Sequence, residues 1–202
     1  IYLKNCTFSI KNNFIRFNNQ SALHIIGGSG EVYNNSIKYN KYGITLEYTT
    51  TNIYLNDIHA YNSLNIYVAY SVANISNNVI TGGESGIEVF HSDIVIHNNK
   101  LKGFSIGLGI SISDSVAVIT DNQIRECWQY GMDLFNSSVY VFNNTIKDIY
   151  RNDGIFVRYC FGEFDDIYIE NNASYFGISI WRSSLSLNDI SVRNTIRISE
   201  SN

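Results

Sequence analysis

The sequence contains no proline, although an average chain of 202 residues would carry roughly ten. Every backbone N–H can therefore donate a hydrogen bond, which favours long, uninterrupted strand ladders. Charged residues make up 16% of the chain, against about 25% in ordinary domains. With a net charge of −4 there is no basic surface, and no apolar run approaches the roughly eighteen residues of a membrane span. We therefore expect neither a nucleic-acid partner nor a membrane span.

Cysteine and histidine are also scarce. The three cysteines, Cys6, Cys127 and Cys160, show no spacing typical of a metal site, and the four histidines fall at unrelated positions. We therefore expect no metal and no cofactor. An odd number of cysteines in an exported protein leaves at least one thiol free or paired between chains, and Cys6 is the candidate for an intermolecular disulfide. The alternative is a buried free thiol that packs like a small aliphatic side chain.

What the sequence does contain is a repeat of about 22 residues. A doubled amide, Asn-Asn or a pair with Asp, begins at residues 12, 34, 56, 77, 98, 121 and 143, and less regular copies follow at 171 and 188. A short alternating apolar segment precedes each pair. About nine residues after the pair comes a glycine followed by apolar, any, apolar, as in Gly86-Ile87-Glu88-Val89. Alternation with period two predicts strands, and self-similarity at this period predicts a solenoid.

Short strands that all run the same way predict coils that stack about 4.8 Å apart through parallel pairing. We predict an all-β, right-handed parallel β-helix of eight or nine coils, forming a single domain over residues 1–202. Residues 1–20 are expected to form an irregular first coil, and residues 161–166 are the candidate for a loop insertion. Asparagine tolerates the left-handed backbone of a tight corner, and its side-chain amide can bond the amides above and below. The predicted internal ladder comprises Asn13, Asn35, Asn78, Asn99, Asn122, Asn144 and Asn172.

On these amide pairs and glycine strands, nearly the whole chain resembles the right-handed parallel β-helix repeat proteins of the pectate-lyase-like superfamily. Its low charge, its many tyrosines and its odd number of cysteines make the chain most similar to the archaeal and bacterial cell-surface or sheath members of this group. The resemblance implies a fold but no chemistry, because the group includes polysaccharide lyases, sugar epimerases, tailspikes and surface proteins. No Asp-Asp pair is flanked by Gly-His-Gly, as it is in polygalacturonases. The proline-containing motifs of pectate lyases and mannuronan epimerases cannot occur without proline.

The first functional expectation is a structural, extracellular subunit that assembles with copies of itself into a cell-envelope layer (an S-layer), a sheath or a surface fibre. The segments at both ends, 1–5 and 196–199, have strand patterns, and an uncapped strand edge recruits further strands. Because the chain begins at Ile1 rather than Met, we expect that processing or truncation removed a leader. Candidate glycosylation sites are Asn5, Asn19, Asn74 and Asn136. Three further sequons, at Asn34, Asn143 and Asn172, are expected to point inward.

The alternative function uses the outward face of the strands that begin with the glycine motif. Glu88 and Asp133 are predicted two coils apart, about 9.6 Å from the strand spacing, which is near the carboxylate separation of an inverting glycosidase. A polysaccharide lyase, hydrolase or epimerase would use this pair. A glycan-binding tailspike or adhesin module would instead bind a polysaccharide on this face, with sugar rings against Phe90, Phe135 and Trp181 and a uronate on Arg158. Outward carboxylates are more often ordinary solvated groups.

Overall fold

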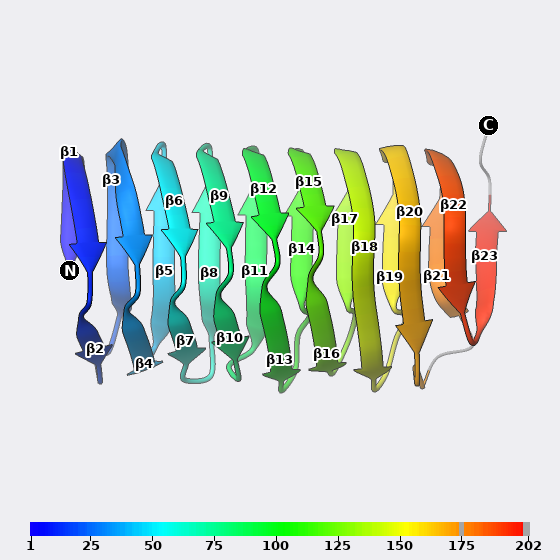
Figure 1. Ribbon diagram of the computed structural model, residues 1–202, viewed down its shortest axis with the longest axis horizontal. Coiled ribbons are helices and arrows are strands. Elements are labelled where there is room, and N and C mark those ends of the chain that lie inside the picture. The colour runs from blue at the N-terminus through cyan, green and yellow to red at the C-terminus, as the bar shows by residue number, and fades with distance from the viewer. Residues whose placement is uncertain (174–175, 200–202) are drawn as a thin grey trace.

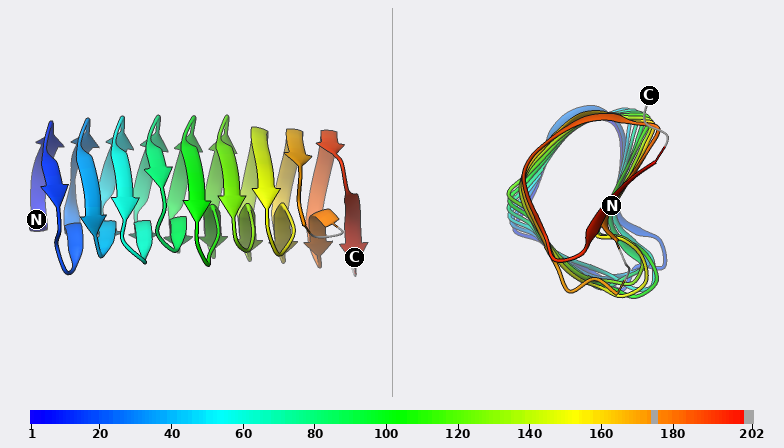
Figure 2. Two further views of the ribbon diagram at one scale, coloured as in Figure 1. Left: turned by 90° about the horizontal axis from the view of Figure 1, so that it is seen from below. Right: turned by 90° about the vertical axis from the view of Figure 1, so that its right-hand side faces the viewer.

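The computed structural model describes residues 1–173 and 176–199, and all regular structure in these residues is β-strand. The strands follow one another along a single long axis from the N-terminus to the C-terminus (Figure 1). Viewed along that axis, about nine coils superpose on one outline (Figure 2). The strand pairings are parallel, and each joins a strand to its copy in the next coil. The predicted all-β parallel β-helix is therefore confirmed. The described residues include no helix of the length and hydropathy that crossing a membrane requires.

Each coil contributes one strand to each of three walls. The first wall holds β5 (Tyr42–Glu47), β8 (Leu64–Ala69), β11 (Ser85–Phe90), β14 (Ile110–Ser113), β17 (Met132–Phe135), β19 (Ile155–Arg158), β21 (Phe176–Trp181) and β23 (Thr195–Ser199). The second wall holds β6 (Thr50–Tyr54), β9 (Val72–Ser76), β12 (Asp93–His97) and β15 (Val116–Thr120). The third wall holds β2 (Phe14–Arg16), β4 (Ser36–Asn40), β7 (Asp57–Ala60), β10 (Val79–Thr81), β13 (Lys100–Phe104) and β16 (Gln123–Cys127).

Five longer strands continue around a corner. The first two, β1 (Tyr2–Lys11) and β3 (Ser21–Tyr33), run from the first wall into the second. Three others, β18 (Ser138–Ile149), β20 (Phe161–Glu170) and β22 (Ser184–Val192), run from the second wall into the third.

The core is a column of aliphatic side chains that point inward from all three walls. On the first wall, residues of successive coils align directly, as Ile66, Ile87 and Ile110 do, and all three are fully buried. Burial of each such side chain stabilises the fold by about 1.5–3 kcal/mol of free energy relative to leaving it exposed. Because alternate residues of a strand face opposite sides, the apolar alternation of the sequence determines which residues face outward.

In most coils a glycine stands at the start of the first-wall strand or just before it, where neighbouring coils approach closely. A Cβ on Gly131 would lie 2.6 Å from the carbonyl oxygen of Gly154, and one on Gly109 would lie 2.6 Å from that of Gly131. An added Cβ at either of these two positions would therefore force the neighbouring coil to shift. In the coil of β8 the position is held by the buried Asn65, whose Nδ2 donates to the backbone carbonyls of Gly82 and Ser85.

The corner between the second and third walls, here called the asparagine corner, contains the amide pairs. Its first residue has a positive φ and points outward; this set is Asn12, Asn34, Leu55, Asn77, Asn98, Asp121, Asn143, Asp166 and Asp189. The next residue points inward. Asn78, for example, donates through Nδ2 to Oδ1 of Asn99 at 3.0 Å, and its own Oδ1 accepts from the Asn56 backbone. Such bonds link Asn13, Asn35, Asn56, Asn78, Asn99, Asn122 and Asn144 into one ladder.

Two details of the predicted ladder are wrong. Asn56 is a ladder residue, because the pair in its coil is Leu55-Asn56 and not Asn56-Asp57. Asn172 is not a ladder residue. The position opposite Asn144 in the next coil is Ile167, and Asn172 follows the left-handed Asn171 at the corner between the third and first walls. The exposed, outward-facing Asn34 and Asn143 also differ from the inward positions expected of them.

Two predicted irregularities are also wrong. Residues 161–166 form no loop insertion: they begin strand β20, and Asp166 is the left-handed residue of its asparagine corner. The corner was not recognised because Ile167 replaces the usual amide. Residues 1–20 form a regular coil over most of their length, since β1 pairs with β3 from Tyr2 to Lys11.

Candidate functional site

The corner between the first and second walls, here called the serine corner, is built like the asparagine corner but with hydroxyl groups. The outward residues with positive φ are Asn5, Gly27, Tyr48, Tyr70, His91, Asp114, Asn136, Tyr159 and Arg182. The inward residues that follow them are Cys6, Gly28, Thr49, Ser71, Ser92, Ser115, Ser137, Cys160 and Ser183. The hydroxyl of Ser92 accepts a hydrogen bond from the Ser71 N–H at 3.0 Å and donates to the Phe90 carbonyl at 2.8 Å. Such bonds form a hydroxyl ladder, in which each hydroxyl group binds the backbone of its own coil and that of the preceding coil.

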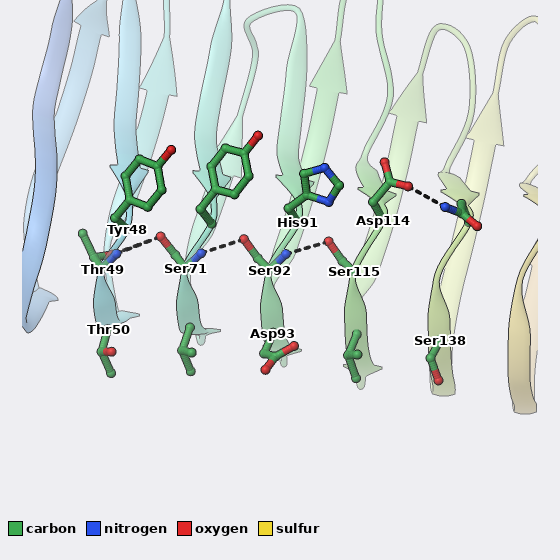
Figure 3. A pocket seen from close by; sticks show the side chains of 14 residues that line it. Tyr48, Thr49, Thr50, Ser71, His91, Ser92, Asp93, Asp114, Ser115 and Ser138 are labelled. Carbon is green, nitrogen blue, oxygen red and sulfur yellow. Dashed lines mark hydrogen bonds between the residues drawn. The ribbon is translucent and has the colours of Figure 1, made fainter.

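A groove runs along the outside of the serine corner, parallel to the solenoid axis (Figure 3). One side is formed by the left-handed residues Tyr48, Tyr70, His91, Asp114 and Asn136. The other side is formed by the first outward residues of the second wall, Thr50, Val72, Asp93, Val116 and Ser138. The hydroxyl ladder lies between them. The groove has a volume of about 950 Å³. It spans five coils, which is roughly 19 Å from the first to the last at the usual strand spacing.

The N-terminal part of the groove is aromatic. The rings of Tyr48 and Tyr70 stack with centroids 5.0 Å apart and planes 6° apart, and the ring of His91 follows 5.3 Å from Tyr70. The Phe90 ring lies beside these residues. Its centroid is 3.9 Å from that of the His91 ring, and it contacts the Tyr70 ring edge-to-face. Tyr48 and Tyr70 are 61% and 46% exposed. The aromatic side chains are therefore held in register while part of each ring stays available to a ligand.

The C-terminal part of the groove is polar. Asn136 donates through Nδ2 to Oδ1 of Asp114 at 2.6 Å, and Asp93 is exposed on the opposite side. No lysine or arginine lines the groove, so its formal charges come from Asp93, Asp114 and, when protonated, His91. No group of three or more His, Cys, Asp or Glu among the described residues could hold a metal ion.

The predicted carboxylates Glu88 and Asp133 lie outside this groove, on the outward face of the first wall. They are aligned in one row with Ser111 between them, two strand spacings apart as predicted. Burial raises the pKa of the Glu88 carboxyl, and a hydrogen bond with Ser85 opposes this shift. The Asp133 carboxylate has a partner, because Nη2 of Arg158 lies 3.1 and 3.2 Å from its two oxygens.

The predicted glycan-binding residues fall in the neighbouring row of the first wall. Phe135, Arg158 and Trp181 occupy successive coils, and Phe90 is separated from them by Ser113. The Arg158 guanidinium lies over the Phe135 ring, 5.2 Å from its centroid, so it is held between this ring and Asp133. The structure thus brings three of the four together. Sugar binding by these residues stays a prediction.

The serine corner was not predicted from the sequence. Its signal is present: a hydroxyl residue recurs at positions 49, 71, 92, 115 and 137, with the same period as the amide pairs. The residue before it is Tyr, His, Asp or Asn in different coils, whereas the asparagine corner repeats one kind of residue. Variation on the outward side therefore hid a regular inward pattern.

All three cysteines occupy corner positions. Cys6 follows the left-handed Asn5 and is aligned with Gly28 of the serine corner. Cys160 takes a ladder position in the serine corner, where its N–H donates to the Ser183 hydroxyl at 3.0 Å. Cys127 is buried opposite Ile149 of the next coil. All three cysteines are free, and burial raises the thiol pKa of Cys127 and of Cys160. Cys6 is partly exposed, and its pairing with another chain stays a prediction.

The candidate glycosylation sites Asn5, Asn19, Asn74 and Asn136 are all exposed. Modification of any of them stays a prediction. Asn136 differs from the others because it lines the C-terminal end of the groove, where an attached glycan would occupy the space that a ligand needs.

Comparisons with known proteins agree with the fold. The sequence profile of the right handed beta helix region matches residues 108–201. No curated protein sequence matches the chain. The A-module of mannuronan C-5 epimerase AlgE6 from Azotobacter vinelandii is similar in structure, with a TM-score of 0.65 and 13% identity over 98% of this chain and 64% of the epimerase chain. The chain therefore spans less than two thirds of that module.

An alginate lyase from Paenibacillus sp. str. FPU-7 has a TM-score of 0.41 and 11% identity over 90% of this chain and 80% of its own. At 13% identity, the similarity to the epimerase module shows the fold alone.

Proposed function

Because the chain is a right-handed parallel β-helix protein, we propose that it binds an extended polysaccharide in the groove of the serine corner. The observation that supports this proposal is the groove itself, which continues across five coils and combines an aromatic edge with a polar one. An open trough of this shape suits a linear polymer better than a compact small molecule, which is usually enclosed on most sides.

The side chains of the groove match the chemistry of sugars. Tyrosine offers both an apolar ring and a hydroxyl, which suits a ligand with C–H faces and hydroxyl groups. Asp93, Asp114 and Asn136 supply oxygen acceptors for sugar hydroxyls, and the coil repeat presents such groups at regular spacing. The structurally similar epimerase is named for a polysaccharide, mannuronan, which agrees with a polymer as the ligand.

Catalysis by Glu88 and Asp133 is the alternative form of this proposal. It is supported by the raised pKa of Glu88, because such a shift favours the protonated carboxyl that a general acid needs. Asp133, in contrast, is engaged by Arg158, and neither carboxylate lies in the groove. An enzyme that uses this pair would depolymerise or epimerise a glycan, and Asp133→Asn would abolish turnover. Binding without turnover is the function that the geometry favours.

A location outside the cell belongs to the same proposal, because long polysaccharides are found in walls, capsules and matrices. Assembly of copies into an envelope layer, a sheath or a fibre stays a separate prediction. It would leave the groove accessible if coils stack end to end, because the groove follows the side of the solenoid (Figure 3).

The experiment that tests binding compares two substitutions of the same kind. Tyr70 and Tyr39 are both exposed, both have a positive φ and both stack on an aromatic ring of an adjacent coil, but only Tyr70 lines the groove. Asn is the replacement because it tolerates the left-handed backbone. Calorimetric titration with a panel of neutral and anionic oligosaccharides should show binding by the protein without substitutions. We expect Tyr70→Asn to weaken it by about tenfold, the equivalent of one aromatic contact.

The control Tyr39→Asn should bind the same oligosaccharides with unchanged affinity. Equal weakening by both substitutions would contradict a site in the groove, and so would the absence of binding to every oligosaccharide in the panel.

A further inference from the structure

We infer that the groove selects polysaccharides without carboxylate or sulfate groups, an inference that rests on the proposed function. Two carboxylates line it, Asp93 on one side and Asp114 on the other, and no lysine or arginine does. A polyuronate such as mannuronan carries a carboxylate on every sugar. Like charges brought together across a binding surface strongly disfavour association.

The neighbouring cations do not neutralise the groove. Arg158 lies in the coil after Asn136 and is already paired with Asp133. Arg182 lies a further coil away, where its guanidinium is 4.9 Å from the Trp181 ring centroid. Asn136 donates a neutral amide hydrogen to Asp114 and leaves the charge of the carboxylate in place. An anionic chain that follows the groove would therefore meet uncompensated negative charge.

The same groups suit an uncharged sugar chain. Ionised carboxylates accept hydrogen bonds from sugar hydroxyls, and charge-assisted bonds of this kind are stronger than neutral ones. Val72 and Val116, both about half exposed, lie on the Asp93 side and offer apolar contact to the sugar ring between the polar groups. The structure thus assigns this chain a ligand class that differs from mannuronan, although its fold is similar to that of a mannuronan epimerase.

The experiment compares neutral hexasaccharides, built from glucose, mannose or N-acetylglucosamine, with hexamers of mannuronate and galacturonate at pH 8 and at low and high ionic strength. Asp114→Asn is the test variant and Asp148→Asn its matched control. Both carboxylates are half-buried at left-handed positions, and both accept a hydrogen bond from an asparagine of the next coil, Asn136 for Asp114 and Asn171 for Asp148. Only Asp114 lines the groove.

At low ionic strength we expect at least one neutral hexamer to bind, and the uronates to bind about tenfold more weakly or worse. Added salt should narrow this gap, because it screens the repulsion. Asp114→Asn should strengthen uronate binding several-fold, whereas Asp148→Asn should leave it unchanged.

The possible failures can be told apart by their results. Uronate binding that equals or exceeds neutral binding, or that weakens as salt is added, overturns the charge selection while the proposed function stands. An equal effect of the two Asn variants also overturns it. Absence of binding to every hexamer overturns the proposed function, and this inference with it.

Discussion

At the scale of single residues, one backbone conformation determines both polar corners. Each corner contains one residue with a positive φ, a conformation that costs roughly 1–2 kcal/mol for residues other than glycine and, in part, asparagine and aspartate. In the asparagine corner the described coils use Asn or Asp at this position except at Leu55, which has a φ of 56°. The corner therefore contains one residue that is poorly suited to its backbone.

Leu55→Asn should stabilise the protein by about 1 kcal/mol, because Asn tolerates the left-handed conformation and the Leu55 side chain is 57% exposed, so little burial is lost. Urea denaturation measures the change. Leu55→Ala is the control, since it shortens the side chain without improving its fit to a positive φ. If the Asn variant were no more stable than the Ala variant, backbone strain at this corner would not be the explanation.

The three thiols should differ in reactivity. Cys127 and Cys160 are buried and have raised pKa values, so little reactive thiolate forms in the native protein at neutral pH. Cys6 is only partly buried. We expect a thiol-specific reagent, followed by mass spectrometry of the peptides, to label Cys6 in the folded protein and the other two only after unfolding. Rapid labelling of native Cys160 would contradict its place in the hydroxyl ladder.

At the scale of strands, the spacing between coils limits the size of the residue at the start of each first-wall strand. Gly131→Ala should destabilise the protein by about 1–3 kcal/mol, because its new Cβ would lie 2.6 Å from the Gly154 carbonyl oxygen. The comparison is Ser111→Ala, an outward position on the same wall, where we expect a change below about 0.5 kcal/mol. Thermal denaturation of both variants tests this. Equal loss of stability in the two variants would show that the glycine at position 131 has no steric role.

The walls could be predicted from the sequence because their pattern is local. Apolar alternation predicted the strand that contains Ile87 and Val89, and the constant period placed Glu88 and Asp133 two coils apart on its outward face. The pairing of Asp133 with Arg158 could not be predicted in this way, because it joins residues of adjacent coils and neighbouring rows through one particular orientation of the arginine side chain.

The corners were predicted less completely, for two physical reasons. Where the second residue of a pair loses its amide, as at Ile167, the strand still turns but the sequence signal disappears. Where the outward residue varies, as it does from Tyr70 to His91 to Asp114, only the inward hydroxyl keeps the period. The groove was missed for the second reason, although the residues that form it follow directly after the outward row that the sequence did identify.

At the scale of the whole molecule, assembly through stacked coils or a Cys6 disulfide stays a prediction with a direct test. Sedimentation velocity of untagged protein should show polymers that grow with concentration and are partly dissociated by reductant. Cys6→Ser should remove the sensitivity to reductant and leave non-covalent stacking intact. A single monomer boundary at high protein concentration would contradict assembly without affecting the glycan groove.

Binding of a polysaccharide in the groove of the serine corner is tested most directly by a crystal structure of the protein with a neutral hexasaccharide at saturating concentration. We expect a sugar chain parallel to the solenoid axis, between the Tyr48 and Asn136 side and the Thr50 and Ser138 side, with a sugar ring against Tyr70 or His91. A sugar chain bound instead across the outward face of the first wall, over Phe135 and Trp181, would contradict it.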